Sequence, residues 1–252
     1  MEEISLILNY SFKAVIKNWK ALLIYGLILL TFIPLSLFHI TSIFSNIVIQ
    51  LISTQLMVYY STPFYTGLPS NEELLSFLEN SSVARIFKER LESSAGIFLA
   101  SFIINVVLVL IIIGIGILVG ISFKEDELTK ELLKLFVSFS VVLILISWFI
   151  YVYPLALGYA MEKEGFGDAF LAMFKIFSPS LWKKTLSFEY FKLITLGGLI
   201  LTAFLLLGLV FIVSLILSPL GIGVLYLTTV FMGSLSAVCY LKTFKGEQPS
   251  QS

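Results

Sequence analysis

Long uncharged stretches, separated by short charged segments, dominate this sequence. They lie between Lys20 and Glu72, Glu92 and Lys124, Lys134 and Glu162, and Lys192 and Lys242. A helix needs about 20 apolar residues to cross the hydrocarbon of a bilayer, because it rises about 1.5 Å per residue. The first and last stretches are long enough for two crossings each, and the middle two for one each. The pattern therefore predicts an all-α polytopic membrane protein with six transmembrane helices.

The charged segments divide this single membrane domain, residues 1–252, into successive parts. We expect an interfacial helix over 4–20, a hairpin of two spans over 21–61, a cytoplasmic segment over 63–94, a third span over 96–122, and an outer loop over 123–134 that forms a short solvated helix. The fourth span is expected over 135–161, a cytoplasmic amphipathic segment over 162–192, the fifth and sixth spans over 193–217 and 220–241, and a tail over 242–252.

The positions of the basic residues predict which segments face the cytoplasm, because cytoplasmic loops collect Lys and Arg. With six spans and a cytoplasmic N-terminus, 13 basic residues fall inside and 3 outside. If the second span did not cross, the same count would give 6 inside and 10 outside. We therefore expect six spans in the cytoplasmic membrane, with both termini cytoplasmic. The acidic first residues differ from a secretory signal peptide, so we expect them to remain in the mature protein.

The second span has one polar half. At 100° per residue, this half carries Ser42, Ser45, Asn46, Gln50 and Ser53, whereas Gln55 falls outside it. Two interpretations stay open: these side chains line a polar path through the membrane, or they form hydrogen bonds to neighbouring helices. We favour the hydrogen bonds, because Ser, Asn and Gln commonly bridge helices inside membranes.

Two interfacial segments share one spacing of apolar residues. The first has Ile4, Leu8, Phe12, Val15 and Trp19, and the second has Phe166, Phe170, Phe174, Phe177 and Leu181, spaced 4, 4, 3 and 4 in both. The second set lies 162 residues after the first, but Trp182-Lys183 lies 163 after Trp19-Lys20, which indicates one inserted residue near a break at Ser178-Pro179. The match predicts an internal repeat of a surface helix followed by a hairpin.

Such surface helices hold their aromatic side chains in the bilayer interface while lysines reach toward anionic lipid. The expected interfacial anchors are Phe12, Trp19, Phe170, Phe174, Phe177, Trp182, Lys183 and Lys184. The partners predicted from this pattern are membrane lipids and a protein docked at the cytoplasmic face.

A set of loose motifs resembles a known family. These are Pro154 near the end of a span, the turn Glu164-Gly165, Ala169 with Phe174, Trp182-Lys183, and Tyr240-Leu241-Lys242 after the last span. The pattern is similar to the six-helix membrane domain attached to some glycerophosphoryl diester phosphodiesterases and to related archaeal and bacterial integral membrane proteins. The catalytic barrel of those enzymes, with its histidines and metal-binding carboxylates, has no counterpart here. The resemblance therefore implies a membrane fold and no catalytic residue.

Composition adds to this picture mainly by exclusion. The chain is 58% hydrophobic and 13% charged, against about 45 to 50% and about 25% in soluble domains. Its 16 basic and 16 acidic residues give no net charge, so we expect no nucleic-acid partner, and its single cysteine predicts no disulfide within the chain. No Asp or Glu falls inside a predicted span, and nucleotide-loop, zinc-protease and nucleophile-elbow motifs are missing. We predict no catalytic residue, cofactor or metal.

Two functional classes follow from these observations. The first is a non-enzymatic scaffold of the cytoplasmic membrane that binds lipid or a protein partner through its interfacial helices. The second is the membrane subunit of a transporter driven by a separate ATPase. In that case residues 162–192 or 70–92 would couple to the ATPase and the polar half of the second span would line the path. We favour the first class.

Overall fold

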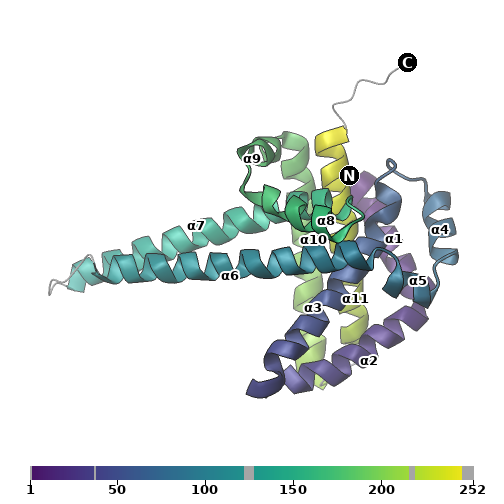
Figure 1. The fold of residues 1–252 in the computed structure, drawn as a ribbon, viewed down its shortest axis with the longest axis horizontal. Coiled ribbons are helices and arrows are strands. Elements are labelled where there is room, and N and C mark those ends of the chain that lie inside the picture. The colour runs from purple at the N-terminus through teal and green to yellow at the C-terminus, as the bar shows by residue number, and fades with distance from the viewer. Residues whose placement is uncertain (1, 37, 122–127, 216–218, 246–252) are drawn as a thin grey trace.

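The computed structural model describes residues 2–36, 38–121, 128–215 and 219–245 as helices and the turns between them (Figure 1). Six of the described helices are long and apolar enough to cross a membrane. They are α2 (Trp19–Ser36), α3 (His39–Ser61), α6 (Leu91–Ile121), α7 (Leu128–Met161), α10 (Phe188–Leu215) and α11 (Pro219–Tyr240). These six candidate spans indicate a multi-pass membrane protein and confirm the predicted all-α class.

Shorter helices connect these spans. They are α1 (Glu2–Lys17), η1 (Thr62–Phe64), α4 (Asn71–Glu79), α5 (Val83–Lys88), α8 (Phe166–Met173), η2 (Phe174–Phe177), α9 (Pro179–Thr185) and η3 (Leu241–Lys245), the last a π-helix. The predicted break at Ser178-Pro179 is confirmed, because Ser178 is extended and Pro179 begins α9. Proline suits this first helical position since it lacks the N–H that a helix start leaves unpaired.

Three spans extend beyond their predicted bounds. Helix α6 begins at Leu91 instead of residue 96, α10 at Phe188 instead of 193, and α7 at Leu128 instead of 135. Residues 123–127 of the predicted outer loop lie outside the described residues, while 128–134 continue into α7 without forming a separate helix. The prediction of a separate helix there was wrong. Residues 128–134 are mostly Leu, Lys and Glu, which are good helix formers, so no residue ends the helix before the span begins.

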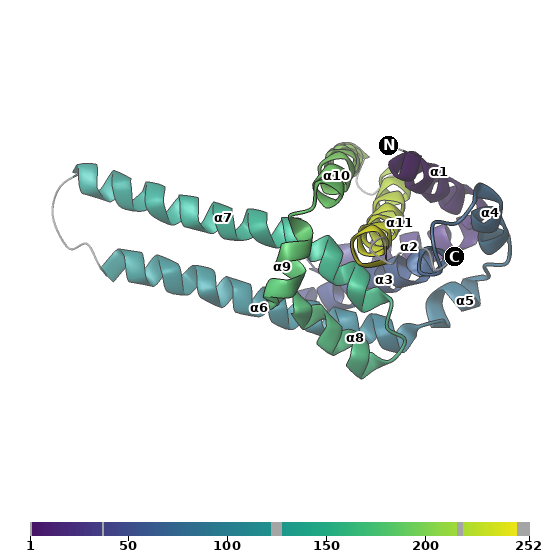
Figure 2. The ribbon, with the colours of Figure 1, turned by 90° about the horizontal axis from the view of Figure 1, so that it is seen from above.

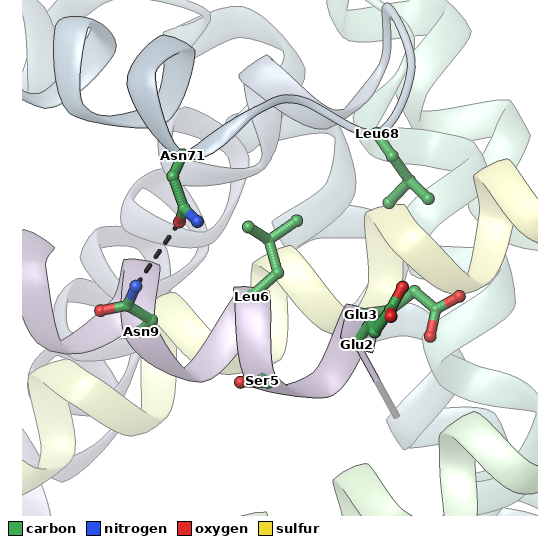
Figure 3. Close-up of a pocket in the computed structure, with 7 residues that line it drawn as sticks. All are labelled: Glu2, Glu3, Ser5, Leu6, Asn9, Leu68 and Asn71. Carbon is green, nitrogen blue, oxygen red and sulfur yellow. Dashed lines mark hydrogen bonds between the residues drawn. The ribbon is translucent and has the colours of Figure 1, made fainter.

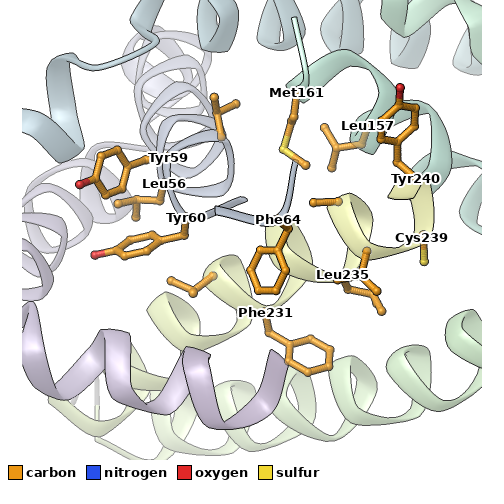
Figure 4. Close-up of a cluster of buried hydrophobic side chains, with 14 of the residues drawn as sticks. Leu56, Tyr59, Tyr60, Phe64, Leu157, Met161, Phe231, Leu235, Cys239 and Tyr240 are labelled. Carbon is orange, nitrogen blue, oxygen red and sulfur yellow. The ribbon is translucent and has the colours of Figure 1, made fainter. Parts of the chain in front are cut away.

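Helix α11 is the centre of the bundle. In α11, 67% of the candidate span is buried, against at most 33% in any other candidate span, and α11 contacts α1, α2, α3, α7 and α10. Small residues permit these crossings: a Cβ added to Gly233 would lie 2.6 Å from the carbonyl oxygen of Met57 in α3. Figure 4 shows the resulting core, in which side chains of α3 and η1 meet Phe231 and Leu235 of α11.

Helices α6 and α7 form a long hairpin that extends away from the other spans (Figures 1 and 2). The far ends of α2, α3, α10 and α11 lie together at the bottom of Figure 1, whereas those of α6 and α7 lie at its left. Large apolar side chains are exposed along both arms of the hairpin. A bilayer would cover this apolar surface, because lipid tails are as apolar as the side chains.

The four segments that the sequence places on the cytoplasmic side contact one another. Their contacts are Lys17 with Glu79 at 2.9 Å, Arg90 with the carbonyl oxygens of Met161 and Lys163, Lys184 with the carbonyl oxygen of Thr243 at 3.3 Å, and Glu3 with Lys242 at 2.8 Å. These segments therefore lie at the same end of the described bundle.

Helix α1 packs on the bundle through a face that the apolar spacing did not single out. Its buried residues are Ile4, Ile7, Tyr10, Ser11 and Ala14, which face the bundle, while Phe12 of the predicted stripe is exposed. The helix has two apolar faces, and the small Ala14 and Ser11 allow a close approach to the neighbouring helices. Of the predicted stripe, Phe12 and Trp19 are exposed, Leu8 and Val15 are half-buried, and Ile4 is buried.

Candidate functional site

Three aromatic rings meet where α7 and α11 end. The ring centroid of Tyr159 in α7 lies 5.7 Å from that of Tyr240 in α11 and 5.8 Å from that of Phe244 in η3. Tyr240 and Phe244 are 5.2 Å apart. These distances are typical of aromatic pairs in direct contact. The three rings form one aromatic surface at the predicted cytoplasmic end of the bundle.

Three lysines surround this aromatic surface. The Nζ atoms of Lys163 and Lys175 lie 4.9 Å and 5.3 Å from the ring centroid of Tyr159. The Nζ atom of Lys184 lies 5.0 Å from the ring centroid of Phe244 and donates to the carbonyl oxygen of Thr243. An ammonium group this close to a ring is attracted by the negative charge of the ring face. We name these residues the basic-aromatic cluster: Tyr159, Lys163, Lys175, Lys184, Tyr240 and Phe244.

Two glycines allow the helices that carry the cluster to approach each other. A Cβ at Gly158 would overlap the backbone oxygen of Ser236, so α7 and α11 touch backbone to backbone one residue before Tyr159. A Cβ at Gly96 would overlap the backbone oxygen of Phe166, so α8 lies directly on α6. Larger residues at either glycine would separate these helices. The first contact joins the rings, and the second fixes the α8 segment that leads to Lys175.

Arg90 fixes the turn that carries Lys163. Its backbone has a φ of 61°, a left-handed conformation that is uncommon for a residue other than glycine. Its Nη2 atom donates to the carbonyl oxygens of Met161 at 2.6 Å and Lys163 at 2.8 Å. These carbonyls belong to the end of α7, where a helix leaves its acceptors unpaired and a positive charge is favourable. The side chain thus stabilises both the end of α7 and its own unusual backbone.

Carboxylates moderate the charge of the cluster. An Oε2 atom of Glu162 accepts from the Tyr240 hydroxyl at 2.7 Å and from Lys163 Nζ at 3.4 Å. Beside it, a cavity of about 330 Å³ is lined by Tyr159, Lys163, Asp168, Leu171, Ala172 and Lys175. Two ammonium groups and one carboxylate therefore share this cavity with an aromatic ring and an exposed leucine. Such a lining can hold a phosphate against the lysines while an apolar chain lies along Leu171.

A second surface cavity has the opposite charge. It measures about 370 Å³ and is lined by Glu2, Glu3, Ser5, Leu6, Asn9, Leu68 and Asn71 (Figure 3). Asn9 donates to Asn71 at its edge, which connects α1 with α4. The hydrogen bond from Lys242 lowers the pKa of Glu3 to about 2, so this carboxylate is ionised at neutral pH. The cavity therefore lacks the ammonium groups that line the cavity of the basic-aromatic cluster.

The structure distributes the predicted anchors over several environments. Phe12, Trp19, Phe177 and Trp182 are exposed, as is Lys183, and Lys20 Nζ lies 5.8 Å from the ring of Trp19. Phe170 and Phe174 are half-buried, with ring centroids 5.2 Å apart. The indole N–H of Trp182 donates to the carbonyl of Ile176 at 2.6 Å, and Lys184 belongs to the cluster.

The predicted polar residues of α3 do not share one environment. Ser45 is buried, and its hydroxyl has no partner within the described part of the chain. Ser53 lies 3.3 Å from the Tyr25 hydroxyl, whereas Asn46 and Gln50 are exposed and Ser42 is half-buried. Gln55, which the polar half excluded, is buried and donates to the carbonyls of Ile86 and Glu89, both at 2.8 Å.

Sequence reasoning missed four members of the cluster: Tyr159, Lys163, Lys175 and Phe244. One signal could have found two of them, because Tyr159 and Lys163 are four residues apart, the spacing of neighbours on a helix; in the structure Lys163 lies in the turn after α7. Their meeting with Phe244 depends on the crossing at Gly158, which no local pattern encodes. As to chemistry, no three His, Cys, Asp or Glu side chains come together as a metal site among the residues described.

Comparisons of the chain with protein-family models, with curated proteins and with solved structures find no match. The resemblance to the membrane domain of glycerophosphoryl diester phosphodiesterases therefore stays a prediction from the sequence.

Proposed function

We propose that the protein is a non-enzymatic scaffold of the cytoplasmic membrane that binds the phosphate headgroups of anionic lipids at its basic-aromatic cluster. The observation that carries this proposal is the placement of three lysines around the rings of Tyr159 and Phe244 at the ends of two candidate spans. An ammonium beside an aromatic ring suits the bilayer interface, where one side is apolar and the other is charged.

The topology of this proposal has both termini in the cytoplasm. The contacts among the four predicted inner segments support it, because six crossings return all of these segments to one side. The excess of Lys and Arg in them assigns that side to the cytoplasm. The cluster then faces the leaflet in which anionic lipids attract basic residues by about 1 kcal/mol each.

Exposed apolar residues around the cluster support a lipid as its ligand. Leu171, Phe177 and Leu186 are exposed on α8, η2 and the end of α9, next to the segments that carry Lys175 and Lys184. Apolar side chains at this level can insert among acyl chains while the lysines bind the headgroup. A soluble anion would leave this apolar surface in water.

The proposal is tested by measuring lipid that stays bound to the purified protein. The triple variant Lys163→Gln, Lys175→Gln and Lys184→Gln should retain phosphatidylglycerol about a hundredfold more weakly than the parent, measured by native mass spectrometry over a lipid titration. Retention of a zwitterionic lipid serves as the internal reference, and trypsin resistance reports that the variant is folded.

A matched triple variant separates the site from general attraction to the bilayer. Lys13→Gln, Lys88→Gln and Lys192→Gln remove the same charge from α1, α5 and α10, outside the cluster. This control should retain phosphatidylglycerol like the parent. Equal losses in both triples, or no loss in the first, would contradict the proposal.

A further inference from the structure

Three amide side chains are exposed on the candidate spans: Asn46 and Gln50 of α3 and Asn105 of α6. None of them has a side-chain hydrogen-bond partner within the described residues. Two buried amides donate within the fold, Gln55 to two carbonyls and Asn18 to the hydroxyl of Tyr60, although the Gln55 oxygen has no partner in the described part of the chain. The exposed amides therefore have bonding groups that the single chain leaves free.

Hydroxyl side chains in the spans find a hydrogen-bond acceptor within their own helix. Thr202 and Thr228 each donate to the carbonyl four residues earlier, at 2.8 Å and 2.7 Å. An amide that donates once to its own helix still has a second N–H donor and a strong carbonyl acceptor without partners, whereas a hydroxyl has then used its one donor. Its oxygen needs a donor from outside its own helix.

The depth of these amides excludes water as the simple partner. Gln50 is the middle residue of α3, about 16 Å from either helix end at 1.5 Å per residue, and Asn46 lies about one turn away. The hydrocarbon of a bilayer is about 30 Å thick, so Gln50 lies near its centre. Ile43 and Phe44, beside Asn46, are exposed, which is typical of a surface in contact with lipid or another helix.

We propose that the face of α3 that carries Asn46 and Gln50 is the surface through which two copies of this chain associate in the membrane. Lipid tails cannot bond an amide, and polar groups in hydrocarbon must find partners in protein. An amide both donates and accepts, so Asn46 and Gln50 of one copy can form hydrogen bonds with the same residues of a second copy related by a two-fold axis. Asn105 lies on α6, which contacts α3, about 21 Å from the start of its helix.

Cysteine cross-linking in liposomes tests the proposal with both amides intact. Ile43→Cys places a thiol on the proposed surface, while the native Cys239 is buried and gives the background. Oxidation should yield a covalent dimer at lipid-to-protein ratios where Leu206→Cys, on the exposed face of α10, yields none. Equal cross-linking at the two positions would indicate random collision and would overturn the proposal.

The double variant Asn46→Leu and Gln50→Leu, made in the Ile43→Cys protein, identifies the amides as the cause. Neither side chain has a hydrogen bond within the described part of the monomer, so the variant should fold like its parent. Its dimerisation constant, measured by energy transfer between labelled copies over a range of lipid dilution, should fall about tenfold. An unchanged constant would refute the proposal, as would a parent that stays monomeric at every dilution.

Discussion

A double-mutant cycle on Tyr60 and Tyr226 tests how the buried polar groups hold the four helices α1, α2, α3 and α11 together. The two hydroxyls are 2.6 Å apart, and Tyr60 also accepts from the side-chain amide of Asn18 at 3.0 Å. Both tyrosines are buried, so neither hydroxyl can turn to solvent when its partner is lost. Tyr60 thus has two hydrogen-bond partners and Tyr226 has one.

This asymmetry sets the expected magnitudes. A side-chain hydrogen bond inside a membrane protein contributes about 0.6 kcal/mol on average and up to about 1.7 kcal/mol. Taking about 1 kcal/mol for each bond, Tyr226→Phe should lower the free energy of unfolding by about 1 kcal/mol and Tyr60→Phe by about 2 kcal/mol. The double variant should also lose about 2 kcal/mol, because Tyr60→Phe already removes the shared bond. The coupling energy is therefore about 1 kcal/mol.

Unfolding by SDS in mixed micelles, followed by tryptophan fluorescence, measures these free energies. Tyr153→Phe provides the control, since its hydroxyl lies 3.4 Å from Ser101 in a different part of the bundle. Its cost should add to that of Tyr60→Phe within about 0.5 kcal/mol, as expected for distant sites. The reasoning fails if Tyr226→Phe costs as much as Tyr60→Phe, or if the pair is additive.

Three further predictions follow from single contacts. Gly158→Ala should lower the free energy of unfolding by about 2 kcal/mol, because its Cβ would overlap the backbone of Ser236, and a stability equal to that of the parent in SDS unfolding would contradict the tight crossing. Gln55→Leu should leave two α5 carbonyls without a donor and raise hydrogen exchange in α5 but not in α4. Lys242 lowers the pKa of Glu3 from 4.5 to about 2, so this pair stabilises α1 fully above pH 4.5 and the stabilisation is lost as pH falls toward 2. The rate at which a protease cleaves α1 should therefore rise as pH falls through this range in the parent but not in Glu3→Gln. The same pH dependence in the parent and in Glu3→Gln would refute this role of the pair.

The sequence predicts the spans well and their mutual packing poorly. Uncharged length together with the positions of Lys and Arg predicts the six candidate spans, and Pro179 marks the break before α9 because its ring fixes the start of a helix. The packing face of α1 could not be predicted in this way, since Phe12 and Tyr10 lie on two different faces of the helix and both faces are apolar. The choice between them depends on the shape of α11, which lies more than 200 residues later in the chain.

The same limit explains why the sequence missed the cluster and why it left Gln55 outside the polar half of α3. Gln55 looked peripheral on a helical wheel, but its partners are carbonyls of α5 that only the fold brings within 2.8 Å. Tyr159 carries no signal of its own until the contact at Gly158 brings it beside Tyr240. Local periodicity reports which residues share a face, and long-range crossings decide what that face meets.

The central position of α11 has a consequence for how this protein is made. The other five candidate spans precede α11 in the chain, so each leaves the ribosome before the helix on which four of them pack exists. Until α11 inserts, Gly158 of α7 and the buried face of α1 lack their neighbour. The bundle therefore matures after insertion, in a lateral assembly step within the bilayer. A chain stopped before residue 219 should persist as separate hairpins that membrane proteases recognise.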